Sequence, residues 1–394
     1  MSLLNGRNGR NGRNGRNGRN GRNGRAGRND ILHAGSESDY DITSAILSTQ
    51  EGLGQYWSSD AEVPFKGLSG DIEPTENDEW REVTRLEAFF QDHLFDHAID
   101  GLFARMDVSI APITLKSNIG DLTIFDLPSF DIESNLKSQM EFVRGASYHR
   151  PERVDEILVQ QTDILSFFGA IHFIDASTTP WTLALLDAVM RLCTYLEMPI
   201  KAAFKQRRPS DYSPHVQPMI QMPSHRAYPS GHAVEAFAVA TILHALAEAK
   251  QVGKQKIKDR KTEYVPFDAT AAFTGTVERP DLLMRLAARI AENRTVAGVH
   301  FPVDSFAGAV MGLSIGEFVV NALSGNRETG QYAIDLEKLK DTDFGYENIT
   351  IESRPSDEAI SRQTISLPGR KTSFGAENFL GQVWLRARKE MQSS

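Results

Sequence analysis

Apolar side chains recur at helical spacing along most of the chain. Between Asp78 and Met106 they fall near every third or fourth residue, as on one face of an amphipathic helix. Residues 107–135 instead hold short runs of Ile, Thr and Pro, which indicate an extended loop or a small hairpin. The overall pattern predicts an all-α protein, a helical bundle with irregular N- and C-terminal extensions. Further helices are predicted at residues 133–148, 151–173, 178–206, 231–250, 280–297 and 303–324.

The pattern divides the chain into four parts. Residues 5–25 are seven copies of Asn-Gly-Arg, and because Asn and Gly disfavour helix and strand while like charges repel, residues 1–29 are predicted to be disordered. Residues 30–75, rich in Ser, Asp, Gly and Pro, form an irregular lead-in to one helical catalytic domain at residues 76–324. Residues 325–394 are polar and are expected to wrap the outside of that core.

Charge is distributed unevenly along the chain. Residues 1–29 contain eight arginines and no acid, so removing them from the net charge of −9 leaves −17 for residues 30–394. An acidic body argues against nucleic acid as the main partner, because neutralising phosphates requires clustered Lys and Arg.

The chain shows no sign of export or of a membrane span. The most apolar segments, Ala233–Ala249 and Ser305–Leu323, carry acidic side chains and are expected to be buried core helices. The single cysteine, Cys193, allows no intrachain disulfide, and the arginine-rich head lacks the apolar region of a secretory signal. The sequence therefore predicts a soluble, cytoplasmic protein.

Three short motifs carry the candidate chemistry. They are Lys201-x6-Arg208-Pro209, Pro229-Ser230-Gly231-His232 and Asn293-Arg294-x5-His300-x3-Asp304. Each is modest alone, but their occurrence together and in this order is not expected by chance.

The set resembles the three-part signature of the type 2 phosphatidic acid phosphatase superfamily. That superfamily includes vanadium-dependent haloperoxidases, bacterial class A acid phosphatases and membrane lipid phosphatases. The resemblance implies a helical bundle of the vanadium chloroperoxidase and acid phosphatase type, and it covers residues 201–304, about a quarter of the chain. One position departs from the pattern: the third motif usually begins Ser-Arg, whereas here it begins with Asn293.

The residue types suit a buried tetrahedral oxyanion. Lys201 would contribute a point charge, and Arg208 and Arg294 would offer planar pairs of donors. The Ser230 hydroxyl and the Gly231 backbone N–H would complete the cage at the positive N-terminus of the following helix.

Two histidines would then have separate tasks. The resemblance implies that His300 bonds the central atom through Nε2, as sole protein ligand of vanadium in a haloperoxidase or as phosphorylated nucleophile in a phosphatase. Asp304, four residues later on the same helical face, would accept the His300 Nδ1–H. His232 would act as general acid or base, protonating a leaving group or helping to deprotonate hydrogen peroxide.

Secondary features favour the haloperoxidase. The resemblance to membrane lipid phosphatases is weakened by the missing membrane helices, and the 60 residues between His232 and Asn293 suit a haloperoxidase better than a compact acid phosphatase. The run Pro223–Tyr228 resembles the one that precedes the same motif in algal bromoperoxidases. Within it, His225 would tune peroxide or halide reactivity or cap the loop, two interpretations of equal weight.

The preferred hypothesis is that the protein is an enzyme that binds one vanadate per chain and uses hydrogen peroxide to oxidise bromide or iodide to hypohalous acid. The alternatives are a soluble acid phosphatase acting through a phosphohistidine at His300 and a non-catalytic oxyanion-binding protein. A small organic acceptor and a homo-oligomer are both compatible with the sequence, which does not fix the halide.

Overall fold

The computed structural model describes residues 88–104, 106–108, 112–118, 122–172, 174–247, 256–258, 261–263, 267–273, 282–349, 351–352, 359–367 and 379–393. The Asn-Gly-Arg repeat, the lead-in and the first part of the helix expected from Asp78 lie outside these residues. The described helices, with their short 3₁₀ turns, are α5 (Ala88–Asp100), α6 (Leu136–Ala146), η2 (Ser147–His149), α7 (Arg150–Gln160), α8 (Leu165–Gly169), α9 (Pro180–Phe204), α10 (Pro209–Tyr212), η3 (Pro214–Val216), α11 (Gly231–Ala247), η4 (Ala269–Phe273), α12 (Leu282–Val296), α13 (Pro302–Leu323), η5 (Tyr346–Asn348) and α14 (Phe379–Ser393).

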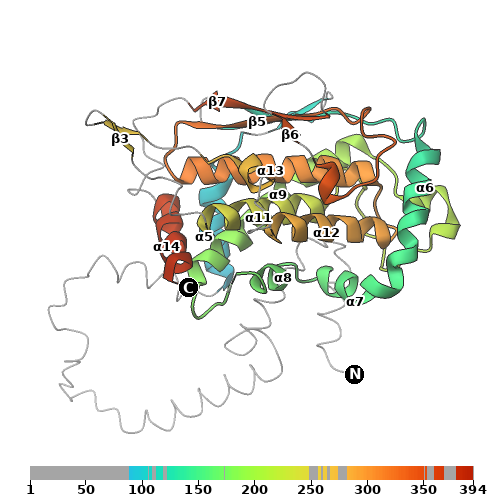
Figure 1. Ribbon diagram of the computed structural model, residues 1–394, viewed down its shortest axis with the longest axis horizontal. Coiled ribbons are helices and arrows are strands. Elements are labelled where there is room, and N and C mark those ends of the chain that lie inside the picture. The colour runs from blue at the N-terminus through green and yellow to red at the C-terminus, as the bar shows by residue number, and fades with distance from the viewer. Residues whose placement is uncertain are drawn as a thin grey trace, which may run out of the picture.

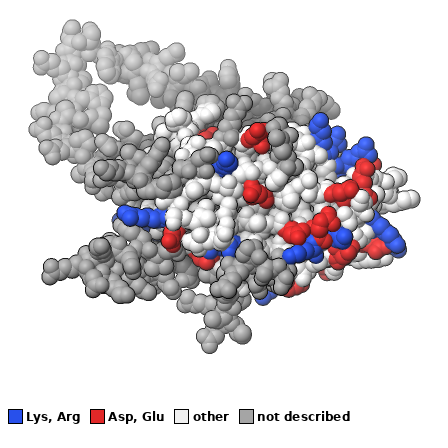
Figure 2. Space-filling model, turned by 90° about the horizontal axis from the view of Figure 1, so that it is seen from above, with Lys and Arg blue, Asp and Glu red and all other residues white. Residues whose placement is uncertain are grey.

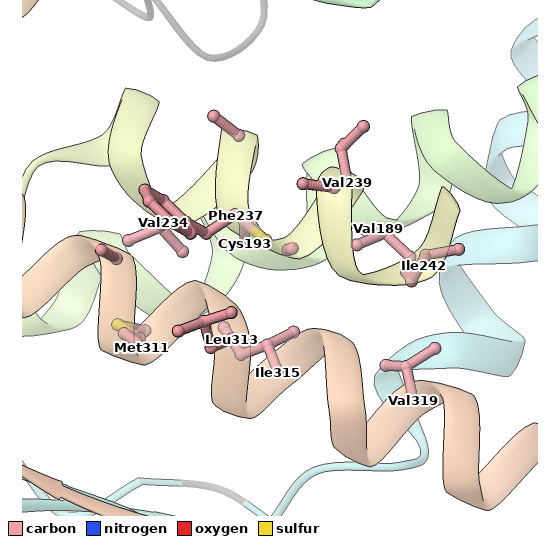
Figure 3. Packing of buried hydrophobic residues seen from close by; sticks show 14 of the residues in the cluster. Val189, Cys193, Val234, Phe237, Val239, Ile242, Met311, Leu313, Ile315 and Val319 are labelled. Carbon is pink, nitrogen blue, oxygen red and sulfur yellow. The ribbon is translucent and has the colours of Figure 1, made fainter. Parts of the chain in front are cut away.

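Helices dominate the architecture, as expected, with α9, α11, α12 and α13 running side by side through its centre (Figure 1). Every residue of α13 is buried, and α11 is apolar on nearly all sides. A helix that is hydrophobic all round belongs in a core. Figure 3 shows Val234 and Phe237 of α11 facing Met311 and Leu313 of α13.

Small residues let the two central helices approach closely. Gly308, Gly312 and Gly316 recur every four residues on α13, so they share one face. A Cβ added at Gly308 would lie 2.5 Å from the Ser230 carbonyl oxygen. This packing holds the start of α11, where the second motif lies, against α13.

A five-stranded sheet covers one side of the helices (Figure 1). Residues 107–135 contain the hairpin that was one of the two expected forms, because β1 pairs with β2 in antiparallel register. Strand β2 pairs in parallel with β5, which continues antiparallel to β7, and β6 runs parallel to β7 at the edge. The strands are β1 (Ile113–Lys116), β2 (Thr123–Leu127), β5 (Glu328–Ile334), β6 (Ile351–Glu352) and β7 (Ile360–Ser366), with a separate pair β3 (Lys256–Lys258) and β4 (Lys261–Glu263).

The described part of the C-terminal extension is more regular than the sequence indicates. It supplies three strands of the sheet and helix α14, whose Trp384 is 1% exposed. Glu390 of α14 accepts the backbone N–H groups of Trp181 and Thr182 at 3.0 and 2.8 Å. The N-terminus of α9 is therefore capped by the distant tail, and the N-cap residue Thr179 makes no side-chain capping bond.

The apolar helices lie inside the protein. Among the described residues, Pro302–Leu323 has the length and composition of a membrane-crossing helix, and its apolar window is completely buried. That burial is the one expected of a core helix.

On the face shown in Figure 2, acidic and basic side chains are interspersed, and the described surface there forms no continuous basic patch.

Candidate oxyanion site

Lys201 lies in the last turn of α9, where the helix ends beside the loop that leads into α11. Its side chain is 1% exposed, and its Nζ donates to the backbone carbonyl oxygens of Ala227, at 3.1 Å, and Pro229. Burial lowers the pKa of Lys201, whereas the nearby Glu197 carboxylate opposes that shift. The first motif thus brings a buried cation to the loop that carries the second motif.

Arg208 joins the first motif to the third. Its Nη1 donates to the Val299 carbonyl oxygen at 2.7 Å and lies 3.3 Å from His300 Nε2. Its Nη2 donates to the His225 carbonyl oxygen at 3.0 Å and lies 3.3 Å from the His225 ring Nδ1. Burial lowers the pKa of Arg208 to about 10, so the guanidinium remains charged at neutral pH.

Ser230 and Gly231 form the start of α11. The Ser230 backbone N–H donates to the Asp304 carbonyl oxygen at 2.9 Å, which fixes this turn against α13. The Ser230 hydroxyl oxygen is buried and has no hydrogen-bond partner among the described residues. Gly231 is the first helical residue, so its backbone N–H is one of the donors that an α-helix leaves unpaired at its N-terminus.

Arg294, in the last turn of α12, faces His232 across the site. Arg294 Nη1 lies 3.5 Å from His232 Nε2, and Arg294 Nη2 donates to Gln160 Oε1 at 3.1 Å. The Nε of Arg294 is buried without a partner in the described part of the chain. Burial lowers the pKa of Arg294 to about 9, which leaves it cationic at neutral pH.

His232 is held by the end of α7. Its Nε2 lies 2.9 Å from the Gln160 backbone oxygen, and because a carbonyl only accepts, this nitrogen carries the proton. Burial and then Arg294 lower the pKa of His232 well below its usual value. The ring is therefore neutral at neutral pH, with Nδ1 as the nitrogen that is left to accept a proton.

His300 and Asp304 make the expected contact, but not for the expected reason. His300 Nδ1 lies 3.1 Å from Asp304 Oδ2. The expectation that both share a helical face was wrong, since α13 begins at Pro302 and His300 precedes it. Asp304 instead reaches back from the first turn and also accepts the Phe301 backbone N–H at 3.0 Å, as an N-terminal acidic residue can.

The protonation of His300 follows from these partners. A carboxylate accepts the Nδ1–H, so Nε2 presents its lone pair beside Arg208. Burial and then Arg208 lower the pKa of His300 well below its usual value, and burial raises the pKa of Asp304 to about 7.

The structure brings all nine residues singled out in the sequence into one buried region, through direct contacts or through neighbouring residues. Lys201, Arg208, Ser230, His232, Arg294, His300 and Asp304 are each 4% exposed or less, whereas His225 is partly exposed. Asn293, which stands where the family pattern has Ser, turns toward α7: it donates to Glu156 at 3.1 Å and to Gln160 at 3.0 Å. Its polar atoms thus join two helices behind the site.

Three further residues belong to this region and were missed in the sequence. Gln206 donates its side-chain amide to Asp304 Oδ1 at 2.5 Å, and Glu197 Oε2 lies 3.9 Å from Lys201 Nζ. Glu197 stands four residues before Lys201, so helical spacing could have pointed to it. Gln160 lies 41 positions before the first motif, and only the tertiary structure brings it to His232 and Arg294.

The donors present fit a tetrahedral oxyanion. Three buried cations and two buried, unpartnered polar atoms, on Ser230 and Arg294, converge around two neutral histidines. Leaving such atoms unpaired is costly, and a bound anion would satisfy them. In the described residues no cluster of three or more His, Cys, Asp or Glu side chains could hold a bare metal ion. The three buried cations and the two unpartnered donors favour an anion as the ligand.

Comparison with known proteins agrees with this site. Residues 181–328 match the model of the PAP2 superfamily. This part of the chain is a PAP2 superfamily domain. All three motifs lie within it, while Gln160 comes from outside the matched segment. No curated protein matches the chain. The superfamily covers phosphatases and haloperoxidases, and its members are typically enzymes.

Proposed function

We propose that the protein is a vanadate-dependent haloperoxidase that uses hydrogen peroxide to oxidise bromide or iodide to hypohalous acid. The observation that carries the proposal is the position of His225. Its ring Nδ1 lies 3.3 Å from Arg208 Nη2, and the same guanidinium lies 3.3 Å from His300 Nε2. Arg208 therefore links the His225 ring, which belongs to the bromoperoxidase-like run Pro223–Tyr228, to His300 Nε2, the nitrogen that would bind vanadium.

The cage would hold vanadate through charge and hydrogen bonding. Lys201, Arg208 and Arg294 would neutralise the anion, and the free Ser230 hydroxyl and the Gly231 N–H would each donate to an oxygen. Bound vanadate would supply a Lewis-acid centre that activates hydrogen peroxide toward halide without changing its own oxidation state. The burial of the cage strengthens each of these interactions by keeping water away.

His300 would bind the central atom through Nε2, the nitrogen that carries no proton here. Asp304 accepts the Nδ1–H of His300 and so keeps the proton on that nitrogen. This hydrogen bond raises the basicity of Nε2. His232 stands on the other side of the site beside Arg294, and its neutral ring would take a proton from hydrogen peroxide at Nδ1.

A soluble acid phosphatase is the second candidate. The specific observation that favours it is the same unprotonated His300 Nε2, which is a competent nucleophile for phosphorus when flanked by a charge-stabilising arginine. His232 would then protonate the leaving group from Nδ1 once that nitrogen has gained a proton, which its lowered pKa confines to acidic pH. Simple oxyanion binding would require neither histidine in these positions.

The deciding experiment measures both reactions on one preparation. Purified protein is given hydrogen peroxide with iodide, bromide or chloride, with and without orthovanadate, and p-nitrophenyl phosphate hydrolysis is followed in parallel. Halide oxidation that requires vanadate is the expected result. Phosphate-ester hydrolysis that vanadate blocks, with no halide oxidation, would instead establish the phosphatase.

The ligand assignment is tested separately with His300→Ala. The variant should lose vanadate-dependent turnover, because Nε2 is the only donor in the cage suited to the central atom. His97→Ala, at an exposed histidine of α5, serves as the matched control and should retain activity. Turnover that persists in the His300 variant contradicts the assignment.

A further inference from the structure

A carboxylate lies against the oxyanion cage, where an anion-binding site would not ordinarily have one. Glu197 stands one helical turn before Lys201 on α9 and is 2% exposed. Its Oε2 lies 3.9 Å from Lys201 Nζ, too far for a hydrogen bond, and accepts none from any described residue. A buried carboxylate oxygen without a hydrogen-bond donor is costly, so this position favours a ligand that brings a donor to it.

The carboxylate is directed at the first residue of α11. A Cβ added at Gly231 would lie 2.6 and 2.8 Å from the two Glu197 oxygens, so the carboxylate fills the space that a side chain would occupy. Gly231 is also the residue whose backbone N–H would bind the anion. Glu197 is therefore in contact with the cage itself, between Lys201 and the start of α11.

The charged groups around Glu197 come from several elements. Lys201 lies on the same helix, and Arg208 is close enough to favour the ionised carboxylate. Glu235 of α11 is the other buried acid nearby, and it accepts a hydrogen bond from Thr194 at 3.3 Å. Asp304 of α13 also acts on Lys201, but faces His300 and Gln206.

We propose that Glu197 is a specificity-determining residue of the cage, which accepts a hydrogen bond from a hydroxyl on the bound anion. It would select tetrahedral oxyanions that keep a proton near neutral pH, such as orthophosphate and vanadate, over sulfate, which keeps none. An ionised carboxylate is an acceptor only, so it pairs with a hydroxyl but faces a fully deprotonated anion with like charge. This inference rests on the proposed anion site and holds for either proposed reaction.

The test is equilibrium binding of inorganic phosphate and of sulfate to the full chain by titration calorimetry near pH 7.5. The wild type should prefer phosphate by about 100-fold or more, since a site built around one hydrogen bond rejects a ligand that lacks it. Glu197→Gln has the same shape but can donate, so its sulfate affinity should rise and the preference should fall to within about tenfold. Glu235→Gln, at the neighbouring buried acid, should retain the wild-type preference.

Acidity gives an independent readout. Burial raises the pKa of Glu197, while Lys201 and then Arg208 act against that shift. Once protonated, the carboxyl can donate, so the sulfate affinity of the wild type should rise as the pH falls. That rise should be larger in the wild type than in Glu197→Gln.

The outcomes separate this inference from the proposed function. If the wild type binds phosphate and sulfate equally well, or if Glu197→Gln keeps the preference, Glu197 does not determine specificity, although the anion site stands. If the wild type binds neither anion nor vanadate, the proposed function fails and this inference fails with it.

Discussion

The side-chain amide of Gln206 lies 2.5 Å from Asp304 Oδ1, while the other oxygen of that carboxylate faces His300. The two residues are 98 positions apart in the chain. The pair fixes the carboxylate that in turn fixes the imidazole. The first motif thus supplies Lys201 and Arg208, and through Gln206 it also helps to orient His300 of the third motif.

Replacing Gln206 by Leu should impair the site without removing any residue of the cage. Asp304 would lose one of its donors, and the orientation of His300 would be less well defined. Loss of such a supporting partner typically costs about 10–100-fold in affinity or activity. Vanadate-dependent turnover and phosphate binding are the measurements. Arg207→Leu changes the exposed neighbour and should behave as wild type; equal losses in both variants would mean that the effect is structural.

Gly231→Ala should destabilise the protein, because the new methyl group would meet both Glu197 oxygens below 3 Å. Overpacking of this kind costs about 1–3 kcal/mol in the free energy of unfolding, measurable by urea denaturation. Adding Glu197→Ala to the same chain makes room for the methyl group and should recover part of the loss. If the losses in the free energy of unfolding from the two single variants simply add in the double variant, the methyl group and Glu197 do not clash.

His232→Gln should change the pH dependence of stability. The pKa of His232 is depressed in the folded state, so below about pH 6.5 the unfolded chain binds a proton that the folded protein does not. The stability contributed by the neutral ring is thus present above that pH and is lost as the pH falls. As the pH falls, His232→Gln should therefore lose less of its free energy of unfolding than the wild type, by up to about 1.4 kcal/mol per pH unit.

That comparison is made by urea unfolding between pH 7.5 and 5. His97→Gln, at an exposed histidine of α5, is the control for the loss of an imidazole outside the site. Identical slopes for wild type and His232→Gln would contradict the depressed pKa.

Glu390→Ala tests whether the C-terminal helix stabilises the core. Glu390 accepts hydrogen bonds from two backbone N–H groups and the Thr182 hydroxyl at the start of α9. Removing such a cap costs about 0.5–2 kcal/mol, so the midpoint of thermal unfolding should fall by a few degrees. Lys389→Ala, at the exposed neighbouring position, should have a smaller effect. A fall no larger than that of the control would show that the cap contributes nothing.

Local signals in the sequence predicted much of the helical framework and the composition of the site. Helical periodicity predicted α9, α11, α12 and α13 to within a few residues, because each places long apolar stretches in the core. The three motifs named the cations and histidines, because a tetrahedral oxyanion requires those residue types.

Tertiary structure alone decided which residues surround these cations and histidines. The sheet combines β2 with strands more than 200 positions later, and the contacts of Gln160 with His232 and of Glu390 with α9 span 72 and more than 200 positions. Such pairings leave no periodic trace, because they depend on how elements pack and not on local conformation. The sequence by itself therefore determined which helices form and which side chains are candidates for the chemistry. Packing determined which neighbours hold those side chains, and burial together with those neighbours determined their protonation, since desolvation acts only once the helices have assembled.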